Sequence, residues 1–143
     1  DIEPHLYDGA TWLSSHSSPY ANADYGTATS ENGLTYHRRE NAVVRPNGPP
    51  LPVVITETGW ARNGVNNRVT AEHQAAWLQR AGEDLWASDD TVLYVCPFLL
   101  AGSFWEVKGW TFVACGVGGN GSAVCGGPYR RMPVYDAWYN TTL

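Results

Sequence analysis

The sequence predicts an α/β fold with parallel strands. Two runs of apolar and β-branched residues, 51–56 and 91–100, are typical of strands buried on both faces of a parallel sheet. A helical pattern lies between them at 70–87, and further helices are expected at 34–44 and from Pro133. Because strands and helices alternate along the chain, we expect right-handed helical crossovers between parallel strands.

Length and composition indicate one domain and argue against several classes of protein. The chain has 143 residues, 43% of them apolar and 13% aromatic, so residues 1–143 are expected to form a single unit with one core. The net charge of −5, without a basic block, argues against nucleic acid or a membrane surface as partner. No apolar run approaches the roughly 18 residues of a membrane span. The N-terminus lacks a signal-peptide pattern, so we expect any such peptide to have been removed.

The ends of the predicted elements follow from local signals. Residues 1–9 are typical of a strand end, and residues 10–33 are expected to form a long loop, a feature that is often functional. Thr70 is a suitable N-cap for the following helix. The apolar stripe of that helix is expected to comprise Ala76, Trp77, Ala81 and Leu85.

Glu57 is the candidate catalytic residue. It follows the first apolar run directly and precedes Gly59, so we expect it at the carboxyl end of a parallel strand, where α/β proteins place their chemistry. Ionised carboxylates resist burial unless they are paired or hydrogen-bonded. The alternative is a structural acid that pairs with a loop arginine such as Arg62. Position alone does not decide between these two interpretations.

Two upstream residues are candidates to join Glu57. If residues 3–8 are extended, His5 and Tyr7 lie on one face and reach the same end of the sheet. A tyrosine hydroxyl can donate a hydrogen bond to a carboxylate, and a histidine can orient a sugar hydroxyl. The alternative for the histidine is a purely structural role.

Tryptophan is abundant, with seven residues against one methionine. Trp60, Trp105 and Trp110 all follow predicted strands, and they are candidates to stack on sugar rings. The alternative is that they cover the core, and at least one of the three is expected to be a core residue only.

Cysteines and glycan-acceptor triplets favour a secreted, extracellular glycoprotein. Cys115 and Cys125 bracket a glycine- and serine-containing loop and can form a disulfide, whereas Cys96 is expected to be a buried free thiol. Asn120 and Asn140 each begin an acceptor triplet.

The sequence offers no motif for a metal or a cofactor, and none is expected. No His or Cys pair has metal-ligand spacing, and no G-x-S-x-G elbow occurs. The glycine-rich stretch 116–121 lacks the Lys-Ser/Thr ending of a phosphate loop.

The segment 52–60, PVVITETGW, resembles the strand-seven segment of retaining glycoside hydrolases of clan A. Members of this clan are (β/α)8 barrels that include many cellulases, mannanases and β-1,3-glucanases. The glutamate that ends strand seven is their nucleophile. The resemblance therefore implies that Glu57 is the nucleophile of a retaining hydrolase that acts on a β-linked polysaccharide or oligosaccharide.

Other segments resemble the clan in the same order. His5-Leu6-Tyr7 is similar to a strand-six His-x-Tyr in which the tyrosine contacts the nucleophile and the histidine borders the sugar. Residues 92–100, with Phe104 and Trp105, resemble strand eight and its loop, and residues 133–137 resemble the start of the closing helix. The resemblance implies an incomplete (β/α)8 TIM barrel that comprises about strands six to eight.

A retaining glycosidase needs a second carboxyl as acid/base, roughly 5–5.5 Å from the nucleophile. In the clan this is the glutamate of an Asn-Glu pair that ends strand four, a strand for which this chain has no counterpart. Glu40-Asn41 has the reverse order within a helical segment, and Glu106 follows strand eight. We therefore expect the acid/base to lie outside the chain.

Three strands cannot close a barrel, and exposed strand edges promote association. Besides carbohydrate, the expected partners are another polypeptide or further copies of this chain that complete the sheet. Two alternatives remain from the sequence: a noncatalytic secreted glycan-binding module, and a self-assembling structural protein derived from a hydrolase.

Overall fold

The computed structural model describes residues 13–16, 33–62, 69–98, 100, 111–114, 116–117, 123–124 and 130–141.

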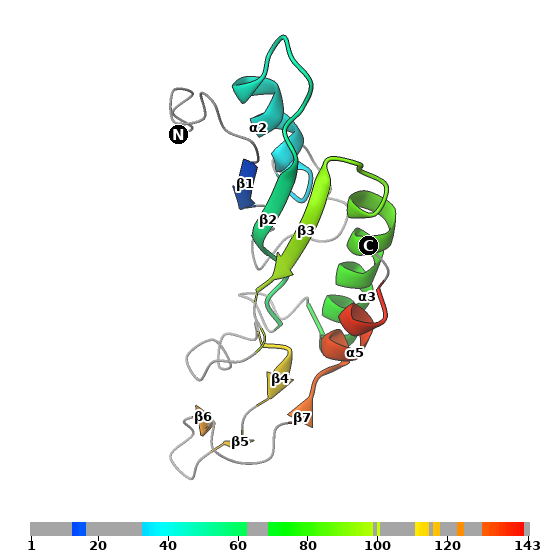
Figure 1. Ribbon diagram of the computed structural model, residues 1–143. Coiled ribbons are helices and arrows are strands. Elements are labelled where there is room, and N and C mark those ends of the chain that lie inside the picture. Colours follow the sequence, from blue (N-terminus) through cyan, green and yellow to red (C-terminus); the bar gives the residue numbers. More distant parts are fainter. Residues whose placement is uncertain are drawn as a thin grey trace.

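A three-stranded parallel sheet lies at the centre of the described chain (Figure 1). Its strands are β1 (Leu13–His16), β2 (Val53–Thr58) and β3 (Val92–Pro97), in the order β1-β2-β3. β2 is therefore the central strand and pairs in parallel with both neighbours. This arrangement confirms an α/β class with a parallel sheet, while a barrel remains a proposal.

The helices confirm the predicted alternation. They are α2 (Tyr36–Val44), α3 (Ala71–Ala81), the π-helical turn η2 (Gly82–Trp86) and α5 (Pro133–Tyr139). Thr70 caps α3 as expected, because its hydroxyl accepts a hydrogen bond from the His73 N–H at 3.1 Å. α5 begins with Pro133 at its first helical position, where a proline loses no hydrogen bond. None of the helices within the described ranges is long and apolar enough to cross a membrane.

One core joins the sheet to the helices. α3 and α5 lie together on one side of the sheet (Figure 1). Val53 and Ile55 of β2 are fully buried and belong to the same cluster as Leu78, Trp86 and Val134 from the helices. Burial of large apolar side chains at about 1.5–3 kcal/mol each stabilises this packing.

Two small antiparallel pairs lie between β3 and α5. β4 (Val113–Ala114) pairs with β7 (Arg130–Arg131), and β5 (Gly116–Val117) pairs with β6 (Ala123–Val124).

β1 corrects the expectation of one long loop at 10–33. The strand Leu13–His16 lies inside that range and pairs with β2. Its sequence, LSSH, is short and mostly polar, so its own composition carries no strand signal. The pairing with β2 defines this strand.

The buried stripe of α3 also differs from the expected one. Ala76 is exposed and Trp77 only half-buried, and the buried residues are Gln74, Ala75, Leu78 and Ala81, followed by Trp86 in η2. A π-helical turn contains one residue more than an α-helical turn, so Trp86 instead of Leu85 reaches the core.

β3 is not buried on both faces. Leu93 is 54% exposed, Tyr94 is 69% exposed, and Cys96 is an exposed free cysteine. The expectation of a buried Cys96 thiol is therefore wrong, because the helices that the structure describes beside β3 pack against the opposite face of the sheet. The other face carries exposed residues of β2 and β3; we call it the open face and define it by Thr56, Leu93, Tyr94 and Cys96.

Candidate functional site

Glu57 lies at an irregularity near the carboxyl end of β2. Along β1 the register passes from Ser15 opposite Ile55 to His16 opposite Glu57, so β2 advances two residues while β1 advances one. The register with β3 shifts in the same stretch. β2 therefore carries a β-bulge relative to both neighbours, a feature that bends a strand and redirects its side chains.

The bulge determines on which face of the sheet Glu57 lies. Val53 and Ile55 are fully buried beneath the helices, and regular alternation would place Glu57 in the same buried row. Instead, Thr56 is exposed, Glu57 is partly exposed and Thr58 is fully buried. The burial pattern changes phase at the bulge, so Glu57 joins Thr56 on the open face.

β2 ends at Thr58, one residue after Glu57, and Gly59 follows it. Gly59 has φ 131°, a conformation that side chains with a Cβ rarely adopt. The Phe98 N–H donates a hydrogen bond of 2.7 Å to the Thr58 carbonyl, which ties the end of β2 to the end of β3. The Thr58 hydroxyl is buried, and it has no hydrogen-bond partner among the described residues.

Trp60 is a core residue in this structure. Its side chain is 1% exposed, and its ring centroid lies 5.7 Å from that of Trp77. Gln74 donates to the Trp60 carbonyl through Nε2. A ring buried to this extent offers no face to a sugar, so Trp60 is the core member expected among the three tryptophans and is not part of the candidate site.

Arg62, the alternative partner for Glu57, has contacts with Gln74 and Thr111. Its Nη1 donates to Gln74 Oε1 at 3.2 Å and to the Thr111 carbonyl at 2.5 Å. The arginine is 6% exposed, so it is held among the residues that support Trp60.

Several predicted site residues lie outside the described residues. These are His5, Tyr7, Trp105, Trp110, Cys115, Cys125, Asn120 and Glu106. Asn140 follows α5 and is exposed, as a glycan acceptor must be. Glu40 is a buried residue of α2.

One residue beside Glu57 was missed by sequence reasoning. His16 is the register partner of Glu57 on β1. It was missed because its segment was assigned to a loop, and the tetrapeptide has no signal that could have corrected this.

A second polar cluster lies at the opposite, amino edge of the sheet. Asp89 Oδ2 accepts from Arg38 Nε at 2.9 Å and lies 3.1 Å from His37 Nε2, while Oδ1 accepts from the Thr91 hydroxyl at 2.6 Å and the Thr91 N–H at 3.1 Å. Burial raises the pKa of Asp89, but the hydrogen bonds from Thr91, Arg38 and His37 outweigh it and hold the pKa well below its usual range. His37 is fully buried, and its Nδ1 has no hydrogen-bond partner in the described chain.

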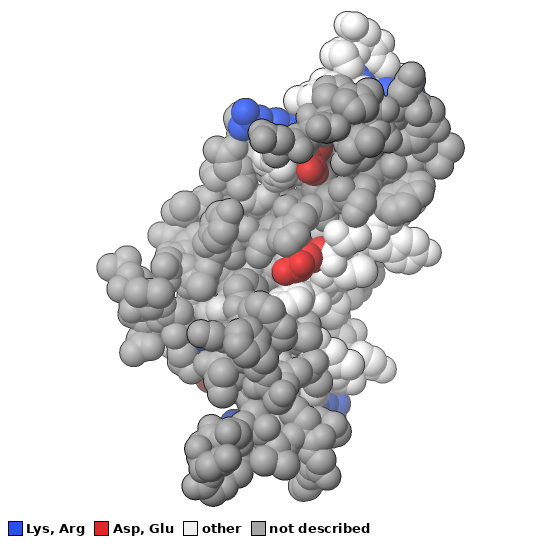
Figure 2. All heavy atoms as spheres, turned by 90° about the vertical axis from the view of Figure 1, so that its left-hand side faces the viewer, with Lys and Arg blue, Asp and Glu red and all other residues white. Residues whose placement is uncertain are grey.

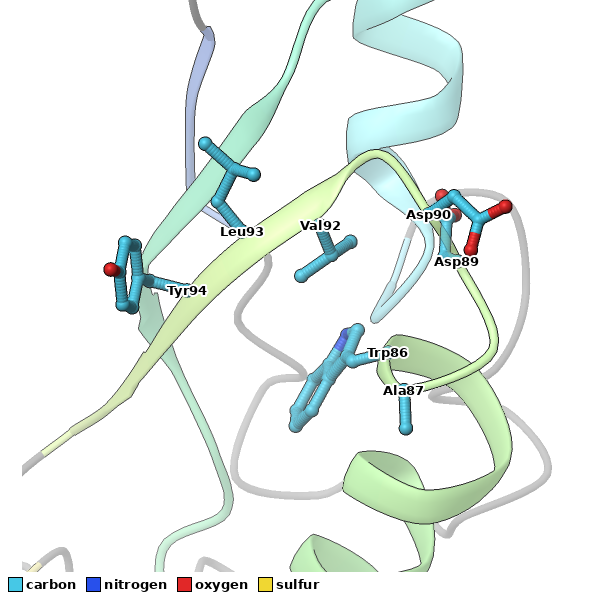
Figure 3. A pocket seen from close by; sticks show the side chains of 7 residues that line it. All are labelled: Trp86, Ala87, Asp89, Asp90, Val92, Leu93 and Tyr94. Carbon is cyan, nitrogen blue, oxygen red and sulfur yellow. The ribbon is translucent and has the colours of Figure 1, made fainter. Parts of the chain in front are cut away.

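A hollow of about 290 Å³ lies beside the amino end of β3 (Figure 3). Its lining consists of Trp86, Ala87, Asp89, Asp90, Val92, Leu93 and Tyr94. Figure 3 shows Val92 directed toward Trp86, while Leu93 and Tyr94 point to the other side of the strand. The register between β2 and β3 also shifts here, so two successive residues reach the open face. The hollow is at the other end of the strands from Glu57 and does not belong to the candidate site.

Acidic groups do not gather into a metal centre in the part that the structure describes. No group of three or more His, Cys, Asp or Glu residues there could hold a metal ion. On the face shown in Figure 2, the acidic atoms of the described residues lie in separate red areas.

The fold and the site together define a class: a parallel α/β unit with a carboxylate at the carboxyl edge of its central strand. No protein-family model matches the chain, and neither a curated protein nor a solved structure matches it.

Proposed function

We propose that the chain contributes the nucleophile side of a retaining glycoside hydrolase site. In this proposal a Glu57 carboxylate oxygen attacks the anomeric carbon, the bond to the leaving oxygen breaks, and a covalent glycosyl ester forms. An acid/base from outside the chain protonates the leaving group and then activates the water that hydrolyses the ester. The substrate class is a β-linked polysaccharide or oligosaccharide.

The bulge at Glu57 is the observation that supports this proposal most. A nucleophilic carboxylate must be held on a rigid element and still be accessible to substrate. The carboxyl end of a central parallel strand supplies rigidity, and the phase change in burial takes Glu57 out of the buried row.

The remaining sugar contacts rest on the resemblance. Tyr7 would hold the carboxylate of Glu57, His5 would contact a sugar hydroxyl, and Trp105 and Trp110 would stack on sugar rings.

A mechanism-based label tests the role of Glu57 without the acid/base. In a 2-deoxy-2-fluoroglycosyl fluoride, fluoride leaves with its electron pair and needs no proton, and the fluorine at C2 slows hydrolysis of the ester. We expect a gluco-, manno- or galacto-configured reagent to add one fluoroglycosyl mass to the chain, either alone or with any polypeptide that copurifies with it. Peptide mapping is expected to locate the added mass at Glu57.

Two variants serve as controls for the labelling experiment. Glu57→Gln is expected to take up no label, and Asp90→Asn, at an exposed acid before β3, is expected to react like the unmodified chain. If all three reagents leave Glu57 unlabelled in both preparations, the nucleophile assignment is incorrect.

Secretion is part of the proposal, and the β5–β6 pair supports it. Gly116 pairs with Val124 and Val117 with Ala123. Cys115 and Cys125 flank this pair in the sequence, and we propose that they form a disulfide. Thiol titration of the denatured, unreduced chain is expected to find one free thiol, that of Cys96; three free thiols would contradict the pairing.

The open face favours a second candidate function, assembly with another polypeptide or with further copies. Leu93 and Tyr94 are more than half exposed on β3, which has β2 as its single strand neighbour in the described sheet. Exposed apolar side chains beside an unpaired strand edge are typical of interaction sites. Light scattering on the chain and on Leu93→Lys is expected to show a smaller mass for the variant; equal monomeric masses would argue against self-assembly.

A further inference from the structure

One side of α5 carries two tyrosine rings that lie nearly parallel. Tyr135 and Tyr139 are four residues apart, a spacing that places side chains on the same side of a helix. Their ring centroids are 6.3 Å apart, and the ring planes differ by 5°. Arg131 lies over the ring of Tyr135, with its guanidinium carbon 5.3 Å from the ring centroid. We call Arg131, Tyr135 and Tyr139 the tyrosine platform.

The neighbouring row of α5 attaches the helix to the core. Val134 is fully buried, and Trp138 packs edge-on against Trp86, with ring centroids 6.2 Å apart. Tyr135 packs partly against the same core, whereas Tyr139 is 77% exposed and is not a member of the core cluster of the described residues. The fold therefore positions the ring of Tyr139 without covering it.

Opposite charges lie beside the platform and balance each other. Arg131 Nη1 is 3.3 Å from Asp136 Oδ1, and the two side chains are 64% and 59% exposed. Exposed guanidinium and carboxylate groups retain sites for further hydrogen bonds. The adjacent cation, Arg130, donates to the Met132 sulfur at 3.9 Å. Because the charges of Arg131 and Asp136 cancel, the surroundings of the rings favour a neutral ligand rich in hydroxyls over an ion.

We propose that the tyrosine platform is a noncatalytic binding site for a neutral pyranose oligosaccharide. The C–H face of a pyranose ring stacks on an aromatic ring, and here one sugar unit covers the exposed ring of Tyr139. Asp136 lies three residues before Tyr139 and is its neighbour on the helix surface. Asp136 accepts hydrogen bonds from the sugar hydroxyls, and Arg131, its ion-pair partner, donates to them.

The identity of the sugar rests on the proposed function, whereas the site itself is separate from Glu57. A β-linked polysaccharide chain that is the substrate in that proposal offers the same pyranose faces to the platform. The platform thus gives the chain a second contact with the polysaccharide, one that takes no part in bond cleavage.

Titration of the full 143-residue chain with neutral hexasaccharides tests this site. The probes are the β-1,4-linked hexamers of glucose and of mannose and the β-1,3-linked hexamer of glucose. Binding is followed by NMR through the ring signals of 13C-labelled tyrosine, and Tyr139 and Tyr135 are assigned from the signals missing in Tyr139→Phe and Tyr135→Phe. The chain is produced without glycosylation, because a glycan on the neighbouring Asn140 would compete for the same surface. We expect at least one hexamer to shift the Tyr139 signals saturably.

Three variants test whether the ring of Tyr139 carries the binding. Tyr139→Ala is expected to weaken binding of that hexamer about tenfold or more, measured through the Tyr135 signals that this variant retains. Tyr139→Phe keeps the flat ring and should bind within about twofold of the unmodified chain. Val43→Ala, which removes exposed apolar surface from α2, should bind as the unmodified chain does.

Several outcomes would overturn the site. These are Tyr139 signals that no hexamer moves, unchanged binding by Tyr139→Ala, and weakened binding by Val43→Ala. The Tyr139 signals of the unmodified chain decide the question even if Tyr139→Ala does not fold. A hexamer of galacturonic acid that binds more tightly than every neutral probe, and is released by salt, would show an anion site at Arg131 and would also refute the proposal.

The Glu57→Gln chain separates the platform from the candidate hydrolase site. We expect the hexamer to shift the Tyr139 signals of this variant as it does in the unmodified chain, and loss of the shift would refute a separate site. Labelling of Glu57 by a fluoroglycoside without any hexamer shift at Tyr139 would refute the platform alone. A hexamer shift without labelling would refute the hydrolase site and leave the platform intact.

Discussion

The two edges of the parallel sheet are built in opposite ways. At the amino edge, Asp89 accepts hydrogen bonds from both Arg38 and Thr91, and the Asn41 side chain bonds to both backbone polar groups of Leu51, at 3.0 and 2.8 Å. At the carboxyl edge, β2 bulges, Gly59 adopts a positive φ, and the buried Thr58 hydroxyl has no partner among the described residues.

This contrast separates residues that maintain the fold from residues suited to bind a ligand. Parallel α/β proteins place their chemistry at the carboxyl ends of strands, whereas the amino ends serve stability. Irregular backbone and unsatisfied polar groups cost free energy, so they concentrate where function requires them. Substitutions at the amino edge should therefore lower stability, and substitutions at the carboxyl edge should change stability little or even raise it.

Asn41→Ala should have the largest effect on stability. The Asn41 amide satisfies the buried N–H and C=O of Leu51, just before β2, and alanine would leave both groups without this partner. We expect a loss of about 2–4 kcal/mol in the free energy of unfolding, measured by urea denaturation. Val43→Ala, at an exposed position of the same helix, is the matched control. A loss below about 1 kcal/mol would show that the amino edge is not a stabilising region.

Asp89→Asn should come next, with an effect that depends on pH. The folded-state pKa of Asp89 is lowered, so the stability that its ionised form contributes is present above the unfolded value of about 3.9 and is lost as pH falls below it. At pH 7 we expect the variant to be less stable by about 1–3 kcal/mol. The difference between the two proteins should shrink as the pH falls below about 4. A difference that stays constant between pH 7 and pH 3 would contradict the assigned hydrogen bonds.

Thr58→Val should act in the opposite direction. The Thr58 side chain is fully buried and its hydroxyl is unsatisfied within the described structure, so an isosteric apolar side chain removes a desolvation cost. We expect a gain of about 0.5–1.5 kcal/mol in thermal or urea unfolding. A loss of similar size would show that the hydroxyl has a stabilising partner.

Sequence reasoning succeeded where a short segment contains its own signal. The apolar runs of β2 and β3, the Thr70 cap and the proline start of α5 each determine a local structure, and all four were confirmed. The position of Glu57 near the carboxyl end of β2 followed from the same reasoning.

The errors came from relations between segments. The strand character of Leu13–His16 depends on pairing with β2, the buried stripe of α3 depends on a π-helical turn, and the exposure of Cys96 depends on which face the helices leave open. The bulge that brings Glu57 opposite His16 is a property of register, which no single stretch of sequence specifies.

Glu57→Gln should have the smallest effect on stability and thereby sharpen the comparison between the two edges. Glu57 is partly exposed and the substitution is nearly isosteric, so the free energy of unfolding should change by less than about 0.5 kcal/mol.

An assay of glycoside hydrolysis gives the complementary measurement. The isolated 143-residue chain should hydrolyse no glycoside, because the proposed acid/base lies outside it. Turnover by the purified chain that Glu57→Gln abolishes would place the acid/base within this sequence and would make a second carboxyl group of this chain the next residue to identify.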